Sequence, residues 1–397
     1  MRNYKRKTKR AITPQNVIKN AVDAVLLEEK SIRKTAKDFN IPEKSLFHLH
    51  SNYEVFTDLQ EGLLEQYVTK ASDIYYGLSS KEVRKLAYQY GKVNSIKMPH
   101  NWSANGAAGE DWFSAYLRRH KKLSIKKPEA ISQARVSSFN PTNVQKFYNN
   151  LQTILNRLKL ESGDIWNMDE TGITTVQTPD HILIRKGFKQ IGRVPSAEKG
   201  NLVTAAVAVF ASGNSIPPFF IFPCVKFKSY FLNGAPDGSA GAANLSGWMT
   251  EVQFLQFSHH FVKYARSTKE RPVLLLLDNH DSHLSVEALN YFKETGVSVC
   301  SFPPHCSHKL KPLDRSVFGP FKKYTNTACD AWMKMHPGST MSIYSIPGIV
   351  GNSFPLACPP NNIKAGFAKT GIYPLHVNIF GEHDFMPAYT TDRPPTK

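Results

Sequence analysis

The sequence predicts a multidomain protein in which all-α modules at the N-terminus precede an α/β domain with a mixed sheet. Before about residue 160 the apolar residues recur mostly at the spacing of amphipathic helices, whereas beyond it they form short runs separated by turns. Strands that come first as a meander and then alternate with helices are typical of a mixed sheet flanked by helices. A chain of 397 residues is also too long for one small core, which favours two or three domains.

The positive charge is concentrated in the N-terminal part of the chain. The whole sequence carries 50 Lys and Arg against 32 Asp and Glu, a formal net charge of +18. Residues 1–150 hold 26 of the basic residues against 14 acidic ones, and so carry +12 of the excess. This balance favours a polyanionic partner such as nucleic acid. The alternative is a basic surface that only keeps the protein soluble.

Cysteine usage and hydropathy indicate the compartment. The five cysteines are scattered and include no C-x-x-C pair, which favours a reducing compartment over a disulfide framework. The basic N-terminus leads into no apolar segment typical of a secretory signal, and no apolar run reaches membrane-spanning length. We therefore expect a protein of a reducing compartment with no membrane partner. The basic run at residues 5–10 suits a nuclear import signal, an arm that grips phosphate, or a solvated tail.

Residues 1–52 are expected to form a helix-turn-helix. Apolar residues recur at helical spacing over residues 14–27, and Ser31 is placed to cap a second helix. A tight break at residues 40–42 separates that helix from a third one, which is the geometry of a helix-turn-helix. Small three-helix units with no role in DNA binding share this pattern. We expect phosphate contacts from the second helix and major-groove contacts from the third, through Arg33, Lys34 and Lys37 and through Lys44, Ser45 and His48 respectively.

Residues 53–130 are predicted to form a second helical module. Its first helix is expected to begin after Thr57 and to share one apolar face formed by Leu59, Leu63, Leu64, Tyr67 and Val68. Its last helix ends in a basic cluster, and residues 123–140 are expected to form an extended basic linker. The residues expected to contact phosphate here are Arg118, Arg119, Lys121, Lys122, Lys126 and Lys127.

The remaining boundaries follow from the change of pattern. We expect a linker and one helix over residues 131–160, the α/β domain over residues 161–380, and a C-terminal tail over residues 381–397. The predicted strands include residues 163–173 and 181–187, and a hairpin over residues 201–222 that turns at Gly213 and Asn214. Residues 226–247 are predicted to form an inserted loop.

Three aspartates occupy special points of the predicted α/β domain. Asp278 ends the apolar run at residues 273–277, and the carboxyl end of a buried strand is where open α/β sheets place their ligands. Asp169 lies on the first predicted strand, and Asp314 precedes a helix. Converging carboxylates suit Mg²⁺ or Mn²⁺, and a pair of such ions promotes phosphodiester cleavage. The alternative for Asp278 is that it only caps the following helix.

Histidine and cysteine near these aspartates allow a second interpretation, a zinc site. The candidate ligands are His280, His283, His305, Cys306 and His308. However, the H-x-x-H pairs follow strands and lack the i, i+4 spacing of a helical zinc motif, which disfavours zinc. We expect His283 to support Asp278 or to contact phosphate, and Glu170 to lie beside the site or on the surface. Lys309 and Lys311 are expected to touch DNA.

Several stretches also resemble a known family. The segments NMDETG, LLLDNHDSH and KPLDRSVFGPFK are similar to the three acidic motifs of pogo/Tigger/jerky-type DDE superfamily transposases. SIRKTAKDFNIPEKSL resembles the first, psq/homeodomain-like helix-turn-helix of that family, and GEDWFSAYLRRHKKLSIKKPEA the close of its centromere protein B-type helix-turn-helix. The resemblance covers nearly the whole chain. It implies a ribonuclease-H-like (DDE) catalytic domain in which Asp169, Asp278 and Asp314 bind Mg²⁺ or Mn²⁺.

Together, the residues and the resemblance predict a nuclear, sequence-specific DNA-binding protein that cleaves phosphodiester bonds and transfers DNA strands. Its expected partners are double-stranded DNA and a second copy of itself, with no small-molecule substrate. One alternative is a domesticated DNA-binding or chromatin protein that retains the DDE fold without catalysis. Another is a ribonuclease or other phosphodiesterase on the same fold, which would lack the two N-terminal modules.

Overall fold

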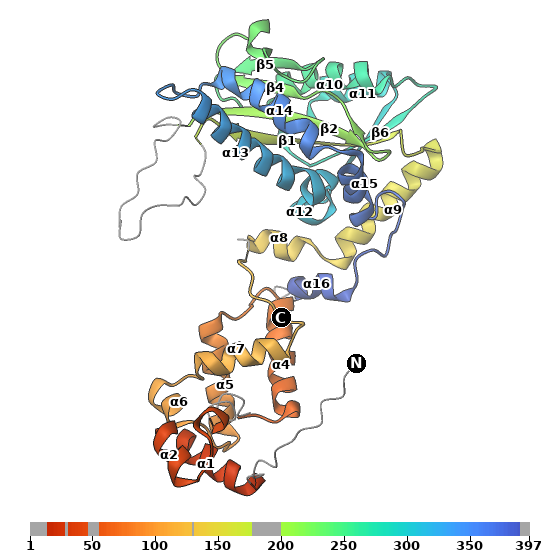
Figure 1. The fold of residues 1–397 in the computed structure, drawn as a ribbon. Helices are drawn as coiled ribbons and strands as arrows, with labels where there is room; N and C mark the ends of the chain where they lie inside the picture. The colour runs from red at the N-terminus through yellow and green to blue at the C-terminus, as the bar shows by residue number, and fades with distance from the viewer. Residues whose placement is uncertain (1–13, 28–30, 47–54, 129–130, 177–199, 390–397) are drawn as a thin grey trace, which may run out of the picture. The chain divides into compact units, whose positions relative to one another are not determined.

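The computed structural model describes residues 14–27, 31–46, 55–128, 131–176 and 200–389 (Figure 1). The chain divides into two compact units, Met1–Ala130 and Ile131–Lys397. Among the described helices, none is long and apolar enough to cross a membrane.

The first unit begins with two short helices and one helical turn. Helix α1 covers Gln15–Leu27 and α2 covers Ile32–Asp38, and residues 43–46 begin a further helical turn. Ser31 caps α2 because its hydroxyl accepts a hydrogen bond from the backbone nitrogen of Lys34 at 3.2 Å. Their small core consists of Ala21, Val22, Ala36, Ile41 and Leu46. Helices α1 and α2 begin and end close to the predicted positions.

Four helices follow in the same unit: α4 Asp58–Asp73, α5 Ser80–Val93, α6 His100–Asn105 and α7 Glu110–Arg119. Capping boxes at Thr57 and Ser79 fix the starts of α4 and α5. Aromatic rings fill the core between these helices, with Phe56, Trp102 and Trp112 in mutual contact. Helix α6 was not predicted, because its sequence is too short and polar to show helical periodicity.

Only part of the apolar face predicted for α4 is confirmed, because Val68 packs against the core whereas Leu63 is exposed. Leu64 is buried, but Leu59 and Tyr67 are 77% and 58% exposed. The buried face instead includes Glu61, whose carboxylate receives both Nε and Nη2 of Arg119 at 2.8 and 2.6 Å. A carboxylate tolerates burial when a bidentate guanidinium compensates its charge, so Glu61 can lie on the buried face of α4.

Arg119→Ala is expected to destabilise the first unit, because it leaves Glu61 buried without its bidentate partner. We expect a loss of about 2–3 kcal/mol, at the lower end for a broken buried pair because the Arg119 side chain is 31% exposed. Chemical denaturation of the full chain measures this loss. Arg118→Ala is the matched control, since Arg118 is exposed and its removal should change stability by less than about 0.5 kcal/mol. Equal stability of the two variants would contradict this role for Arg119.

A seven-stranded mixed sheet forms the centre of the described part of the second unit. Its order is β5-β4-β2-β1-β6-β7, with a short β3 paired to β2. Strand β1 runs antiparallel to β2 and parallel to β6. The bounds are β1 Ile165–Thr174, β2 Leu202–Phe210, β3 Asn214–Ser215, β4 Phe219–Pro223, β5 Ala240–Asn244, β6 Val273–Leu277 and β7 Val297–Ser301. The predicted mixed sheet and the hairpin formed by β2 and β4 are confirmed.

Helices cover both faces of this sheet (Figure 1). One core contains α10 Glu251–Ala265 and α11 Val286–Glu294, with Leu275 and Leu277 of β6. The other contains Leu274 and Leu276 of the same strand. Its helices are α9 Pro141–Leu158, α13 Phe318–Met335, α14 Ile346–Ala357 and α15 Pro360–Lys369. Alternate residues of β6 therefore enter opposite cores, as its uninterrupted apolar run predicts.

Short elements complete the second unit. They are α8 Gln133–Ser138, the 3₁₀ turns Ser229–Leu232, Asp281–Leu284 and Ile343–Ser345, α12 Ser307–Leu310, the π-turn Leu313–Val317 and α16 Glu382–Tyr389.

Four segments differ from the prediction. The linker expected over residues 123–140 contains α8, and α9 belongs to the core of the second unit and not to a separate connection. The loop predicted at residues 226–247 contributes β5, which pairs parallel with β4. The expected C-terminal tail contains α16, whose Phe385 ring stacks on Phe139 at 5.3 Å. The strand predicted at residues 181–187 lies outside the described residues.

Candidate active site

Parallel pairing brings two of the predicted aspartates together. In the β1–β6 register Asn167 lies beside Leu276, so two further residues along each chain bring Asp169 beside Asp278. Asp169 stays within β1, whereas β6 ends one residue before Asp278. Asp314 lies in the π-turn that follows α12 in the same unit. The three aspartates therefore come from two adjacent strands and one turn.

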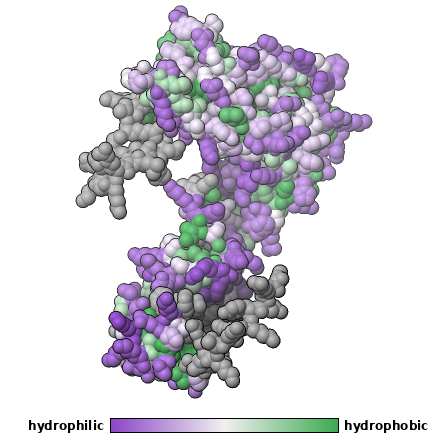
Figure 2. Space-filling model, viewed as in Figure 1, coloured by the Kyte–Doolittle hydropathy of each residue, from purple (hydrophilic) through white to green (hydrophobic). Residues whose placement is uncertain are grey.

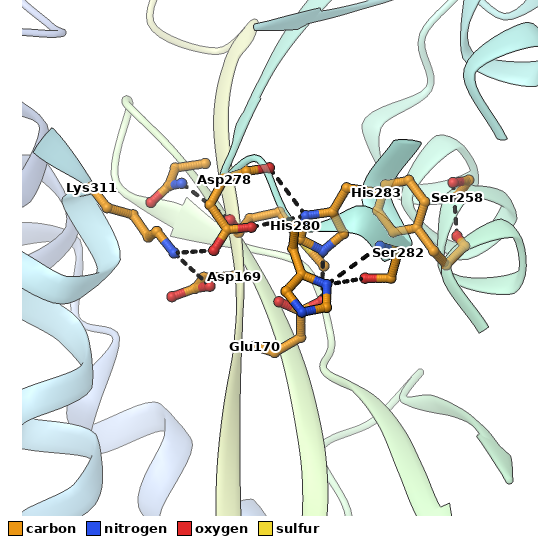
Figure 3. A network of polar contacts seen from close by, with 11 residues as sticks. Asp169, Glu170, Ser258, Asp278, His280, Ser282, His283 and Lys311 are labelled. Atoms are coloured by element: carbon orange, nitrogen blue, oxygen red, sulfur yellow. Dashed lines mark hydrogen bonds and ion pairs between the residues drawn. The ribbon is translucent and has the colours of Figure 1, made fainter. Parts of the chain in front are cut away.

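A lysine joins the first two aspartates. Lys311 Nζ lies 2.7 Å from Oδ1 of Asp169 and 3.2 Å from Oδ2 of Asp278 (Figure 3). Lys311 is 3% exposed, so its charge is compensated by these carboxylates and not by water. The expectation that Lys311 touches DNA was wrong. The sequence offered no sign of this burial, because lysine is rarely buried unless it is paired.

A buried amide fixes the segment that carries Lys311. The Asn167 side chain accepts a hydrogen bond from the backbone nitrogen of Leu313 at 3.0 Å. Its Nδ2 donates to the Leu276 carbonyl at 3.1 Å. Asn167 is fully buried, and these bonds link β1, β6 and the π-turn at one point. The aspartates and Lys311 are therefore held by backbone contacts, independently of their own charge interactions.

His283 supports Asp278 from the side opposite Lys311 (Figure 3). Its Nε2 lies 2.8 Å from Oε1 of Glu170. Its Nδ1 lies 3.0 Å from Oδ1 of Asp278 and donates toward the Asp278 backbone carbonyl at 3.2 Å. Asp278 Oδ1 is buried and accepts no hydrogen bond from the described residues, so its contact with His283 is an ion pair. His283 thus connects the carboxylates of Glu170 and Asp278.

Burial and charge push the site's pKa values in opposite directions. Burial raises the pKa of Asp169 to about 7, although Lys311 opposes this shift. Burial also acts on Asp278, but His283 and Lys311 hold the pKa of that carboxyl well below its usual range. Burial lowers the pKa of His283, and its contacts with Asp278 and Glu170 outweigh this and raise it to about 10. At neutral pH the site therefore contains a charged imidazole and a charged ammonium next to Asp278.

Asp314 is near the pair but does not share its contacts. Burial raises the pKa of Asp314, Lys311 lowers it, and the Asp278 charge adds to the rise. Within the described residues no group of three or more His, Cys, Asp or Glu side chains has the arrangement of a metal site. The oxygens of Asp169 and Asp278 suit a hard cation chemically, but the position between them is taken by the Lys311 ammonium. A divalent ion fits these carboxylates only if that ammonium moves.

The zinc interpretation gains no support from the described residues. Cys306 is buried, and its thiol donates to the Ser138 carbonyl at 3.2 Å. His308 Nδ1 lies 3.1 Å from the His305 carbonyl. His283 is engaged with two carboxylates. These side chains have separate partners and do not converge on one point.

Most of the residues expected to contact DNA are exposed in the first unit. Figure 2 shows that the visible face of each unit is largely hydrophilic. Arg119 is exposed as well, but its guanidinium makes a bidentate contact with Glu61 that joins α7 to α4. His48 lies outside the described residues. The other exposed residues are Arg33, Lys34, Lys37, Lys44, Ser45, Arg118, Lys121, Lys122, Lys126 and Lys127.

One sequence family matches the part of the chain that carries most of this site. Residues 199–340 match the family described as DDE superfamily endonuclease. The matched segment includes Asp278, Lys311 and Asp314, whereas Asp169 precedes it. The match therefore covers all the strands from β2 to β7, together with the π-turn.

One curated protein and several solved structures are also similar to this chain. The MFS-type transporter clz9 of Cochliobolus lunatus is 27% identical over 223 residues, which are 54% of this chain and 24% of that protein. The chain thus spans about a quarter of that relative. The structure of the Mos1 strand transfer complex aligns with this chain at 12% identity and a TM-score of 0.46. The alignment covers 91% of this chain and 95% of the Mos1 chain. For the Mos1 mariner paired end complex with Mn, the alignment covers 90% of this chain and 94% of that chain, again at 12% identity and a TM-score of 0.46.

Proposed function

We propose that the protein binds double-stranded DNA through its helical unit and cleaves phosphodiester bonds with its α/β unit. The observation that carries this proposal is the adjacency of Asp169 and Asp278 around one cation position, in a unit whose residues 199–340 match DDE superfamily endonucleases. The finer form of the proposal is a pogo/Tigger/jerky-type transposase that acts in the nucleus and transfers DNA strands. Its two helical modules would then be helix-turn-helix units, and it would work as a homodimer.

Each part of the chain has a distinct task in this proposal. Asp169 and Asp278, with Asp314 nearby, would hold Mg²⁺ or Mn²⁺. When bound, such ions supply activation of the attacking water or hydroxyl and stabilisation of the leaving oxygen. His283 orients the Asp278 carboxylate, and Asn167 fixes the π-turn against both strands. The exposed basic residues of the first unit supply the phosphate contacts that keep DNA bound.

One observation favours a second function, a DNA-binding protein that retains the fold without catalysis. The buried Lys311 ammonium already pairs with both Asp169 and Asp278, so each carboxylate has a cationic partner within the protein itself. Nicking of supercoiled plasmid by the full chain in Mn²⁺ separates the two functions. We expect nicked circles with the catalytic function, whereas binding without nicking in either Mg²⁺ or Mn²⁺ would favour the second.

The proposal also predicts how DNA affinity depends on salt. Affinity for a duplex should fall linearly with the logarithm of salt concentration, since each neutralised phosphate releases counterions. Arg118→Ala should weaken all sequences alike and reduce the slope by about one, whereas Lys44→Ala should change the preference between sequences. Fluorescence anisotropy with labelled duplexes at several salt concentrations measures both effects. Affinity that does not depend on salt would exclude this mode of binding.

A further inference from the structure

The buried Lys311 ammonium lies between two carboxylates, where a cation shared by both would also lie. Lys311 Nζ is within 2.7 and 3.2 Å of one oxygen each from Asp169 and Asp278. A divalent ion bound by the same two oxygens would lie about 2.1 Å from each of them if it were Mg²⁺. That position overlaps the ammonium, and two cations with no water between them repel strongly. The ammonium and the ion therefore exclude each other.

The backbone around Lys311 is anchored, so the side chain is the part that can move. The Lys311 nitrogen donates to the Ser307 carbonyl at 2.9 Å, and its carbonyl accepts from Arg315 at 3.2 Å. Asn167 holds the backbone nitrogen of Leu313 two residues later. The lysine stem, in contrast, has four rotatable bonds and a single polar end. Rotation of this stem would release the ammonium without disturbing the segment that carries Asp314.

We propose that Lys311 is a tethered cation that closes the metal position, and that a divalent ion binds only after the Lys311 ammonium has left Asp169 and Asp278. This inference rests on the proposed function and adds to it a built-in barrier to metal binding. The ion meets a competent site only in the fraction of molecules in which the lysine has moved away. Its apparent affinity is reduced by that fraction.

A neighbouring lysine shows that position, and not general basicity, is what matters. Lys309 lies two residues earlier, and its Nζ pairs with Asp384 at 3.3 Å. No contact joins Lys309 to Asp169 or Asp278 among the described interactions. Lys309→Gln therefore removes the same charge from the same segment without opening the site. It is the matched control for Lys311→Gln.

Calorimetric titration of the metal-free full chain with Mn²⁺ tests the inference. Lys311→Gln is expected to bind Mn²⁺ at least about tenfold more tightly than the wild type, because no ammonium has to leave. Lys309→Gln should keep the wild-type Kd within about twofold. In the absence of metal, Lys311→Gln should melt at a lower temperature than the wild type, since two carboxylates lose their shared partner. Saturating Mn²⁺ should raise its Tm more than that of the wild type.

The other outcomes separate this inference from the proposed function. Equal Mn²⁺ affinity in wild type and Lys311→Gln, with binding lost in Asp169→Asn, would overturn the lysine inference and leave the metal site standing. No Mn²⁺ binding in wild type or in Lys311→Gln would overturn both the inference and the proposed use of metal.

A measurement on the wild type alone covers the case in which Lys311→Gln does not fold. Reductive methylation followed by mass spectrometry reports which lysines are accessible. Lys311 is expected to be protected in metal-free protein, because its side chain is 4% exposed, and to become methylated once Mn²⁺ saturates the site. Lys311 that stays protected while calorimetry shows Mn²⁺ bound would overturn the inference.

Discussion

Asp278→Asn is expected to lower DNA nicking by the full chain by about two orders of magnitude or more while leaving DNA affinity nearly unchanged. Asparagine keeps the shape of aspartate but loses the charge that would hold a divalent ion beside Asp169. Asp278 directly follows β6 in the second unit, whereas the residues expected to bind DNA lie in the first. Nicking of supercoiled plasmid and duplex binding, measured on the same preparation, give the two results.

Asp281→Asn is the matched control for this experiment. Asp281 is an exposed carboxylate three residues after Asp278, so its removal changes the local charge equally without touching the Lys311 contacts. We expect it to nick at the wild-type rate. Wild-type nicking by Asp278→Asn would show that the catalytic carboxylates are elsewhere. A parallel loss of DNA binding would show that the substitution unfolds more than the site.

His283→Ala is expected to destabilise the second unit by about 3–5 kcal/mol, because it leaves the buried side of Asp278 and the Glu170 carboxylate without their shared cation. The histidine is 1% exposed, so water cannot replace it without a structural change. Denaturant titration of the full chain measures the loss. His376→Ala, at an exposed histidine of the same unit, should stay within about 0.5 kcal/mol of wild type.

The pH dependence of this effect has a definite sign. The folded-state pKa of His283 is raised from 6.5 to about 10, so the folded protein binds this proton more tightly than the unfolded chain does. The stabilisation is fully present below about pH 6.5 and is lost as pH rises toward 10. Wild-type stability should therefore decline across this window more steeply than that of His283→Ala. Identical slopes would mean that His283 is neutral in the folded protein.

The strand that precedes Asp278 was predictable because its residue types indicate that both of its faces are buried. Five consecutive large apolar residues require a strand with both faces covered, and each face of β6 enters a separate core. The first polar residue after such a run is expected at the carboxyl end of the strand. Strands β2 and β4 were predictable as a hairpin, because their apolar runs flank a turn at Gly213.

The role of Lys311 was not predictable, since a lysine in a polar stretch normally indicates a solvated surface. Its burial depends on Asp169, which lies 142 positions earlier in the sequence, and on Asn167, which anchors the following turn. The buried Glu61 in α4 was missed in the same way, because Arg119 compensates it from a distant helix. Charge pairs between remote residues leave no periodic signal.

The most direct measurement of the central claim is a crystal structure of the full chain grown with Mn²⁺, in which anomalous scattering locates the ion. The account predicts Mn²⁺ bound by carboxylate oxygens of Asp169 and Asp278, with the Lys311 ammonium turned away from both. An ordered Lys311 still between the two aspartates at saturating Mn²⁺, with the ion absent or bound elsewhere, would contradict it.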